Sequence, residues 1–446
     1  MYIRRIEINN IRSIEHFEMT FAEGQEAGWH VLIGDNGAGK STIVRSVALA
    51  MLDITDINAA GQNWDDWLNR KHDLGSIDVQ IAPDGRYETQ TGLVQNRITF
   101  EWEQYGKEES RATLLEVIFR GRKSYSKTSY ATPTITTASA PPPTPSAPSE
   151  HLRVDAWFSA AYGPFRRFTG GSLEKDKLYQ TNPRLGAHLS AFGEDVALSG
   201  ALAYLQELYV RQLEDRYNDR PVNPSLDYLK TFINEAGLLP HQTKLESISV
   251  KDGVYFKDGN GSIVRDVQMS DGYRSVLSMM FELIRQLIRV YGADVVFQQI
   301  SRNNLVIDLP GVVLVDEIDA HLHPTWQTRI GQWFTRYFPN LQFIVTTHSP
   351  LVCRAAEKGS VWRLAAPGSN QQSGEVIGIE RDRLIYGNVL DAYGTEVFGE
   401  NVSQSNEGQE LAEKLAKLNV KSFKGIITEE ERQELYELKA KLPTAR

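Results

Sequence analysis

The sequence predicts an α/β protein with a mixed sheet and a helical insertion lobe. Three observations lead to this prediction. Apolar and polar residues alternate within the first 21 residues, as in half-buried strands. Continuous apolar runs at 30–33, 312–315 and 343–346 are typical of strands that are buried on both faces. Leucines recur at helical spacing between residues 198 and 213.

The composition is that of a globular protein in a reducing compartment. The 446 residues are 41% hydrophobic and 24% charged, enough for two or three domains' worth of core. The formal net charge of −9 argues against a uniformly basic nucleic-acid-binding surface. The single cysteine, Cys353, cannot form an intramolecular disulfide. No apolar run reaches the ~20 residues that span a bilayer, and no signal peptide is recognised, so we expect a cytoplasmic protein.

A glycine-rich segment follows the first buried strand and precedes a helical pattern. Residues 34–41 read GDNGAGKS and match G-x-x-x-x-G-K-[ST] in full. Glycines let backbone N–H groups turn toward phosphate oxygens, Lys40 supplies a point charge, and the Ser41 hydroxyl suits Mg²⁺. The helix N-terminus also attracts anions. The residues expected to bind ATP here are Gly34, Asn36, Gly37, Gly39, Lys40, Ser41 and Thr42.

An acidic pair ends the buried strand at 312–315. Asp316 is expected at the carboxyl end of that strand, beside the phosphate loop, where it can hold Mg²⁺ together with Ser41. Glu317 follows directly and can polarise the attacking water. Two carboxylates suit this chemistry because one must stay anionic for the metal while the other handles the proton of water. Glu317 is therefore predicted to be catalytic.

Two further segments carry groups that suit phosphate. His348 follows another apolar strand within the run TTHSP; it can hydrogen-bond a γ-phosphate, so it is predicted to be catalytic. The run SDGYRS at 270–275 precedes a predicted helix, and its hydroxyl, glycine N–H and helix N-terminus form a second anion site. An ordinary helix cap is the alternative interpretation. Because the first site already has donors, Ser270 and Gly272 are predicted to contact ATP bound by a partner copy.

Together these motifs resemble those of ABC-type ATPases of the branch that includes SMC, RecF and OLD proteins. The run DEIDAHLHPTWQ at 316–327 is especially similar to that branch and differs from transporter cassettes. The resemblance covers roughly 1–60 and 245–365. It implies an ABC ATPase head that dimerises around two ATP molecules with Mg²⁺, with Asp319 at the interface between the halves.

Two details of the resemblance stay open. The family's Q-loop glutamine has three candidates in one broad window, Gln62, Gln80 and Gln180. His321 and His323 form an H-x-H pair, but no cysteine or acidic cluster with metal spacing accompanies them. A structural or interface role is therefore favoured over a metal site.

Composition divides the chain into segments. The stretch at 131–150 is rich in Pro, Thr, Ser and Ala, cannot bury a core and is predicted to be flexible. In the tail, Thr428 and Glu431 form a capping-box signature. The expected segments are the N-terminal part of the ATPase head (1–130), the flexible insertion (131–150), a mainly helical lobe (151–243), the C-terminal part of the head (244–400) and a helical tail (401–446).

Several absences narrow the function. The sequence shows no membrane segment, no long coiled-coil arm and no nuclease motif of the kind that OLD-type proteins append. A head of this kind resembles the ATPase subunits of two-gene bacterial antiviral systems, of the Septu (PtuA) and PARIS (AriA) types. The run AYGPFRRF at 161–168 is similar to theirs. The resemblance implies a homodimer or larger assembly that senses a trigger, such as DNA or a phage product, and controls a separate effector or nuclease subunit.

The competing hypothesis is a RecF-like DNA-repair or DNA-clamp ATPase. Such a protein needs a basic surface, and basic runs can bind phosphate backbones. The candidate residues are Arg120, Arg122, Lys123 and Lys127, with Arg166 and Arg167. A charge run is more often simply solvated, so the defence interpretation is favoured. A transporter cassette is the third class, and it would require a membrane permease as partner.

Overall fold

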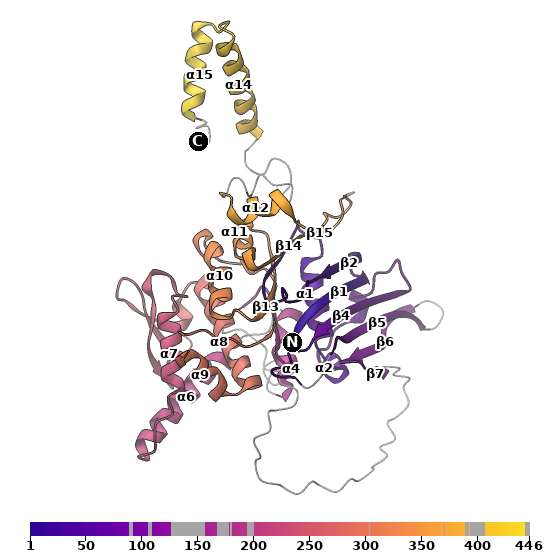
Figure 1. Ribbon diagram of the computed structural model, residues 1–446, viewed down its shortest axis with the longest axis vertical. Helices are drawn as coiled ribbons and strands as arrows, with labels where there is room; N and C mark the ends of the chain where they lie inside the picture. The colour runs from indigo at the N-terminus through magenta and orange to yellow at the C-terminus, as the bar shows by residue number, and fades with distance from the viewer. Residues whose placement is uncertain are drawn as a thin grey trace.

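The computed structural model shows a head with a helical lobe on one side and a helical hairpin near the C-terminus (Figure 1). The insertion at 131–150, Gln180, Arg167 and Lys127 lie outside the described residues. The described residues are 1–88, 92–105, 109–125, 157–166, 178, 181–193, 200–302, 304–369, 371–388, 392 and 406–441.

A largely parallel six-stranded sheet forms the centre of the head. Its order is β15 (Gly374–Glu375), β14 (Gly359–Arg363), β3 (Gly28–Ile33), β13 (Leu341–Thr347), β12 (Gly311–Val315) and β8 (Ser159–Tyr162). Only β15 pairs antiparallel with its neighbour. Val31 and Leu32 enter different cores, one on each face of the sheet. The parallel order places the carboxyl ends of β3, β13 and β12 side by side at one edge.

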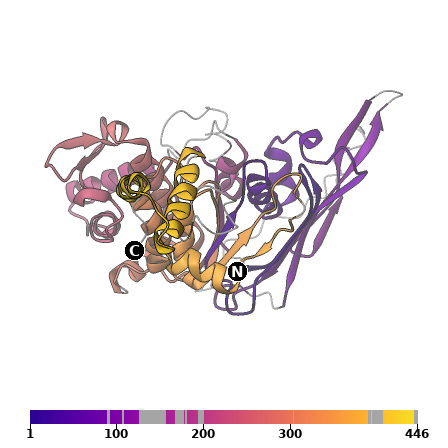
Figure 2. The ribbon, with the colours of Figure 1, turned by 90° about the horizontal axis from the view of Figure 1, so that it is seen from above.

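A second, antiparallel sheet packs on this centre. Its order is β2 (Ile14–Thr20), β1 (Tyr2–Ile11), β4 (Leu74–Ala82), β5 (Val94–Tyr105), β6 (Glu109–Phe119) and β7 (Arg122–Tyr125). The predicted alternation is confirmed, since Ile6 and Ile8 are buried while Glu7 between them is half-buried. Helix α1 (Lys40–Ala50) contacts both sheets. Figure 2 shows the antiparallel sheet and the helical lobe at opposite sides of the head.

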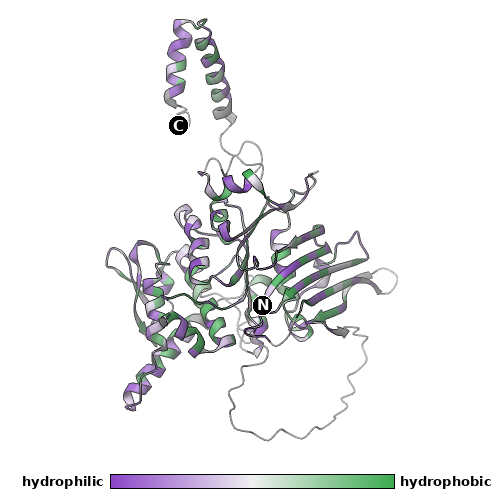
Figure 3. Ribbon diagram, viewed as in Figure 1, coloured by the Kyte–Doolittle hydropathy of each residue, from purple (hydrophilic) through white to green (hydrophobic). Residues whose placement is uncertain are grey.

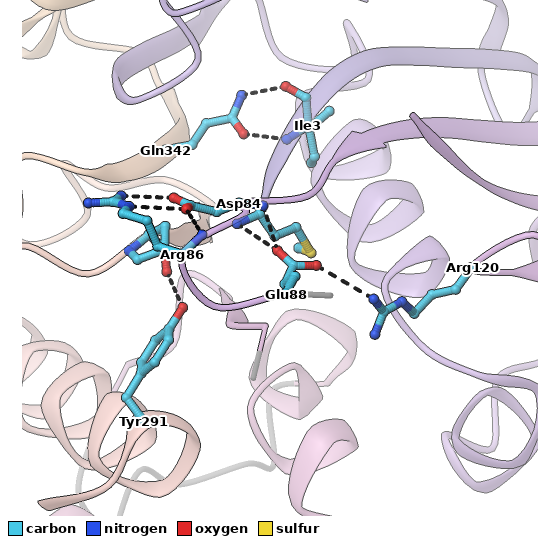
Figure 4. Close-up of polar contacts among 9 residues, drawn as sticks. Ile3, Asp84, Arg86, Glu88, Arg120, Tyr291 and Gln342 are labelled. Carbon is cyan, nitrogen blue, oxygen red and sulfur yellow. Dashed lines mark hydrogen bonds and ion pairs between the residues drawn. The ribbon is translucent and has the colours of Figure 1, made fainter. Parts of the chain in front are cut away.

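Polar contacts join the two sheets near the start of the chain (Figure 4). The Gln342 side chain of β13 accepts from the Ile3 backbone N–H at 2.7 Å and donates to the Ile3 carbonyl at 3.0 Å. The Met1 ammonium pairs with Glu88 Oε1 at 3.0 Å, and Arg120 Nη2 lies 3.5 Å from Glu88 Oε2. The Gln342 bonds thus hold β1 against the parallel sheet, while the buried ion pair, which is costly to break, ties the start of the chain to the segment after β4.

The helical lobe combines helices with a small sheet. Its elements are α6 (Gly200–Tyr217), α7 (Ser225–Glu235), β9 (Lys244–Ser249), β10 (Gly253–Lys257), β11 (Ile263–Arg265), α8 (Asp271–Tyr291) and α9 (Ala293–Arg302). Leu205 and Leu208 are buried as the leucine stripe predicted, and Leu198 lies outside the described residues. Leu213 is instead 41% exposed, because α6 extends beyond the lobe (Figure 1).

Two local boundaries differ from the sequence-based expectation. The segment 151–243, expected to be mainly helical, contributes β8 to the central sheet, because its buried run Ser159–Tyr162 pairs with β12. Helix α8, expected from Ser275, begins at Asp271, so Gly272 lies inside the first turn.

The remaining helices are α2 (Ile54–Ala59), η1 (Trp64–Asp66), α4 (Pro183–Gly186), α5 (Leu189–Phe192), η2 (Pro240–Gln242), η3 (Asp266–Gln268), α10 (Pro324–Tyr337), α11 (Pro350–Cys353), η4 (Arg354–Lys358) and α12 (Gly378–Tyr386).

The tail forms a helical hairpin with a core of its own. Its helices are α14 (Asn406–Phe423) and α15 (Glu429–Lys441), and four leucines pack between them. The predicted capping box is confirmed: Thr428 N–H donates to Glu431 Oε2, and Glu431 N–H donates to Thr428 Oγ1, both at 3.2 Å. Figure 3 shows that α15 is the more hydrophilic of the two helices. Across the described ranges, no helix is both long enough and apolar enough to cross a membrane.

Candidate nucleotide site

The phosphate loop connects the end of β3 to the start of α1. Gly37 and Gly39 have φ angles of 82° and 93°, a left-handed conformation that favours glycine. Gly39 is also the N-cap residue of α1, and no side chain caps this helix. A Cβ atom on Gly39 would lie 2.9 Å from Cγ1 of Ile14, so β2 packs closely against the turn. The loop therefore presents uncapped N–H groups at a helix N-terminus, an arrangement that binds phosphate.

The Lys40 side chain lies back over this loop. Its Nζ donates to the carbonyl oxygens of Gly34 at 2.6 Å and Asp35 at 2.9 Å, and the residue is only 6% exposed. Burial lowers the pKa of Lys40, while the negative charges of Asp316 and Glu317 oppose that shift. The ammonium group thus lies within the electrostatic field of the acidic pair.

One hydroxyl group fixes the acidic pair. Asp316 follows β12 and is 2% exposed. The Thr346 hydroxyl, on β13, donates to Asp316 Oδ1 at 2.6 Å and accepts from the Glu317 backbone N–H at 2.7 Å. Glu317 has a φ angle of 47°, which is unusual for a residue other than glycine. Its side chain is half-buried at the end of the strand.

The next hydroxyl of β13 connects two loops. Thr347 Oγ1 donates to Asp319 Oδ1 at 2.6 Å and accepts from the Ser349 backbone N–H at 2.9 Å. His348 lies between Thr347 and Ser349 in the chain, and its side chain is exposed. Sequence reasoning missed Thr346 and Thr347, although two hydroxyl residues that end a buried apolar strand were a signal. These threonines hold together the acidic pair, the loop that contains Asp319 and the segment around His348.

The start of α8 carries the second predicted anion site. Ser270 is the N-cap residue by position, but its side chain makes no capping hydrogen bond and is exposed. A Cβ atom on Gly272 would lie 2.6 Å from the carbonyl oxygen of His321. Gly272 therefore has a packing role within its own chain. A cavity of ≈ 100 Å³ lies beside it, with Leu322 and Trp326 in its wall.

The H-x-H pair has a local structural role. His323 caps α10, where its Nδ1 accepts from the Thr325 backbone N–H at 3.4 Å. His321 is exposed, with a φ angle of 63°. Among the residues that the structure places, no three histidines, cysteines or acids are grouped to hold a metal. Mg²⁺ nevertheless fits the phosphate loop, because it needs only one or two protein oxygens there, from Ser41 and Asp316, alongside phosphate and water.

Sequence reasoning missed two arginines, Arg45 within α1 and Arg12 near it. Arg12 follows β1, and its guanidinium lies 4.9 Å from the Trp67 ring centroid. Burial lowers the pKa of Arg12, and the positive charge of nearby Arg45 lowers it further. The Nε atoms of both arginines are buried with no hydrogen-bond partner among the described residues. The only sequence signal was the position of Arg45, one helical turn after Ser41.

Several predicted polar residues lie away from this edge or inside the protein. Arg166 is buried and 4% exposed, so it is not available to contact DNA. Arg120 is engaged by Glu88 and lies 5.7 Å from the Trp157 ring centroid. Of the Q-loop candidates, Gln62 donates to a neighbouring carbonyl and Gln80 lies within β4. The third, Gln180, lies outside the described residues.

Comparisons with known proteins match both halves of the head. One protein-family model, described as "AAA ATPase domain", matches residues 1–84. A second, "AAA domain, putative AbiEii toxin, Type IV TA system", matches residues 153–354. The Septu protein PtuA of Bacillus mycoides (strain KBAB4) is 25% identical over 81% of this chain and 40% of that protein. The Retron Ec83 probable ATPase of Escherichia coli is 38% identical over 24% of this chain and 18% of that protein.

The solved structures similar to this chain include an Smc head bound to the C-terminal winged-helix domain of ScpA. It is 16% identical with a TM-score of 0.46, over 85% of this chain and 99% of that chain. The present chain spans less than half the length of the two curated relatives. Both family models describe AAA-type domains, and the α/β head of this chain is therefore similar to ATPase domains, among them a Septu protein PtuA and a retron probable ATPase by sequence.

Proposed function

We propose that the chain binds ATP with Mg²⁺ at the phosphate loop, dimerises around two nucleotides and controls a separate effector subunit, such as a nuclease, in antiviral defence. The observation that carries this proposal is the convergence of Lys40, Asp316 and Glu317. They follow β3 and β12, which flank β13 in the parallel sheet, and the charges of both acids act on Lys40. A basic group held between a phosphate loop and two carboxylates suits nucleotide hydrolysis.

In this proposal the residues of the phosphate loop hold the polyphosphate. The backbone from Gly34 to Gly39, with Lys40 and Thr42, surrounds it, and Ser41 and Asp316 hold Mg²⁺. The metal would neutralise charge on the β- and γ-phosphates when bound. The uncapped start of α1 adds backbone donors for the nucleotide.

The hydrolysis step depends on the residues at the ends of β12 and β13. Glu317 positions the attacking water and accepts its proton, and exposed His348 donates a hydrogen bond to the γ-phosphate. Thr346 supports both acids, since its hydroxyl donates to Asp316 and accepts from the Glu317 N–H. Asp316 can thereby face the metal while Glu317 faces the attacking water.

A second copy would complete the site. Ser270 is exposed at the start of the 21-residue helix α8, and its hydroxyl makes no capping bond. These features support a contact from Ser270 to the γ-phosphate of a nucleotide held by the partner, with Gly272 behind it and Asp319 at the interface. ATP would then hold the dimer together, and hydrolysis would release it.

The hairpin of α14 and α15 is the proposed docking surface for the effector. The hairpin leaves Phe423 at the end of α14, Tyr436 on α15 and Ile426 in the turn between them exposed by 96%, 78% and 65%. Exposed aromatic residues of this kind are enriched at protein interfaces. We place the complex in the cytoplasm, which suits the single buried, free Cys353. The trigger would be DNA or a phage product.

The variant Glu317→Gln tests the proposed site. Removing the base should leave ATP binding intact, slow hydrolysis by about 100-fold or more, and trap an ATP-dependent dimer. Turnover assays and light scattering on a sizing column measure both effects. The control is Glu357→Gln, an exposed acid on η4 that should behave as wild type. Wild-type turnover in Glu317→Gln, or a monomer at saturating ATP, would contradict the proposal; mass spectrometry of proteins co-purified with the trapped dimer tests the effector.

A further inference from the structure

We propose that Arg166 is a positioning residue that couples the acidic end of β12 to helix α8, the helix that carries Ser270. The proposal rests on the function proposed above, because it concerns how one ATP site influences the surface offered to the second copy. The buried Arg166 side chain carries it. All five of its N–H groups have acceptors, and these acceptors belong to different parts of the head.

The guanidinium holds the turn that follows β12. Nη1 of Arg166 donates to the carbonyl oxygens of Gly163 at 2.8 Å and Asp316 at 2.7 Å. Nη2 donates to the carbonyl oxygens of Glu317 at 2.9 Å and Ile318 at 3.4 Å. Three consecutive carbonyls of the acidic turn thus bind one planar group. This turn includes the left-handed Glu317, so Arg166 helps to fix the direction in which the Glu317 side chain leaves the strand.

The same group also reaches helix α8. Nε of Arg166 donates to Ser275 Oγ at 3.1 Å, and Ser275 is 2% exposed. Ser275 lies just over one helical turn after Ser270, so this bond acts on the part of α8 that faces the proposed partner. A second contact supports the first, because Gly272 packs directly against the His321 carbonyl. The chain that follows β12 is therefore linked to the start of α8 twice, through Arg166 and through the packing of Gly272 against His321.

Burial makes this connection rigid. Burial lowers the pKa of Arg166 to about 10, while the charges of Asp316, Asp319 and Glu317 oppose the shift, so the group stays cationic at neutral pH. Its hydrogen-bond acceptors are neutral oxygens that a buried cation cannot lose without cost. If the acidic turn moved alone, an N–H group would lose its acceptor. The turn and α8 are therefore expected to move together.

The base of the Arg166 side chain is also fixed. Its segment follows β8, and the Asp316 backbone N–H donates to the Tyr162 carbonyl at 2.8 Å. A Cβ atom on Gly163 would lie 2.0 Å from the Ser190 carbonyl oxygen, so only glycine allows this close backbone contact. A fixed base and a planar five-donor fork suit a coupling role that lysine cannot reproduce.

The test compares two neighbouring serines of α8. Ser275→Ala removes the bond from Arg166 to the helix and leaves the carbonyl bonds intact. Ser278→Ala is the matched control, because Ser278 is equally buried and its hydroxyl donates to the Ser275 carbonyl at 3.0 Å. We expect Ser275→Ala to lower kcat about tenfold, since a bond to a charged group is lost. Its affinity for a fluorescent ATP analogue should match that of Ser278→Ala. Its melting temperature should be lower than that of Ser278→Ala, because the buried Arg166 Nε loses its acceptor, so kcat is compared well below both melting temperatures.

Arg166→Lys gives a second measurement. It should lower kcat further, and adding Ser275→Ala to it should cause no additional loss, because the bond is already gone. Equal kcat values for Ser275→Ala and Ser278→Ala would overturn the coupling. If Arg166→Lys does not fold, the comparison of the two serine variants is sufficient to test the proposal. Glu317→Gln measured in parallel separates the two failures. A fast Glu317→Gln rejects the proposed site, whereas a slow one with equal serine variants rejects only the coupling.

Discussion

The helix starts of α1 and α8 were both predicted to bind phosphate, yet they are built differently. Neither has a side-chain cap. At α1 the surrounding chain supplies Lys40, which is 6% exposed and hydrogen-bonded to its own loop. At α8 the corresponding polar group is Ser270, which is exposed. The first helix start therefore has a charged donor from its own chain, whereas the second offers only a hydroxyl, which we propose serves the nucleotide of another copy.

The glycines of the two sites also differ in their physical reason. Gly37 and Gly39 have positive φ angles, which other residues adopt at a cost. Gly272 lies within the first turn of α8 and is needed because His321 leaves no room for a Cβ atom. A substitution at Gly272 would therefore disturb packing as well as any contact with a partner's nucleotide. Ser270 is the cleaner position for testing the second site.

The largest expected difference between the two helix starts is in nucleotide affinity. Lys40→Ala removes the buried cation of the first site, so affinity for ATP should fall by about 100-fold or more. Ser270→Ala should leave the affinity of the isolated chain unchanged. Titration with a fluorescent ATP analogue measures both, with Lys358→Ala as an exposed-lysine control. If Lys40→Ala bound ATP normally, the phosphate-loop assignment would be wrong.

Mixing variants tests whether the second half-site serves another copy. Lys40→Ala and Ser270→Arg should each be nearly inactive, while their mixed dimer contains one intact composite site. Random pairing then predicts recovery of about a quarter of wild-type turnover at equal concentrations. Differently tagged chains, purified through both tags, show whether the mixed dimer forms. A verified mixed dimer without turnover would mean that Ser270 acts within its own chain.

The sequence predicted the parts of the site that depend on local patterns. A strand, a glycine turn and a helix adjoin in the chain, and so do an apolar strand and its terminal acids at 312–317. Side chains that bond across the fold could not be predicted in this way. Thr346 is 30 residues from Asp316, and Arg166 is 150 residues from it. A lone arginine reads as a surface charge until its carbonyl partners are known, which is why Arg166 was grouped with DNA-binding candidates.

The last expected difference concerns how stability depends on pH, and it has opposite signs beside the two helices. His30 on β3, the strand before α1, is 2% exposed, and burial lowers its pKa to about 4. An unfolded histidine has a pKa of about 6.5, so the unfolded state binds more protons between these values. The His30 contribution is therefore complete above pH 6.5 and falls as pH drops toward 4, by up to about 3 kcal/mol.

Glu282 on α8 should show the reverse trend. It is 1% exposed, and burial raises its pKa to about 8, while the Gln286 hydrogen bond and the charge of Arg289 oppose the shift. Arg285 Nη2 also lies 2.8 Å from Glu282 Oε1, and this ion pair favours the charged form, so the expected trend is the one that burial sets. The folded state then binds the extra proton, so the Glu282 contribution is lost as pH rises from about 4.5 toward 8. Denaturant unfolding across pH measures both trends in wild type. His30→Gln should make the free energy of unfolding less dependent on pH between about 4 and 6.5, and Glu282→Gln should do so between about 4.5 and 8. If either variant kept the wild-type pH dependence in its own range, that group would not be the one that titrates on unfolding.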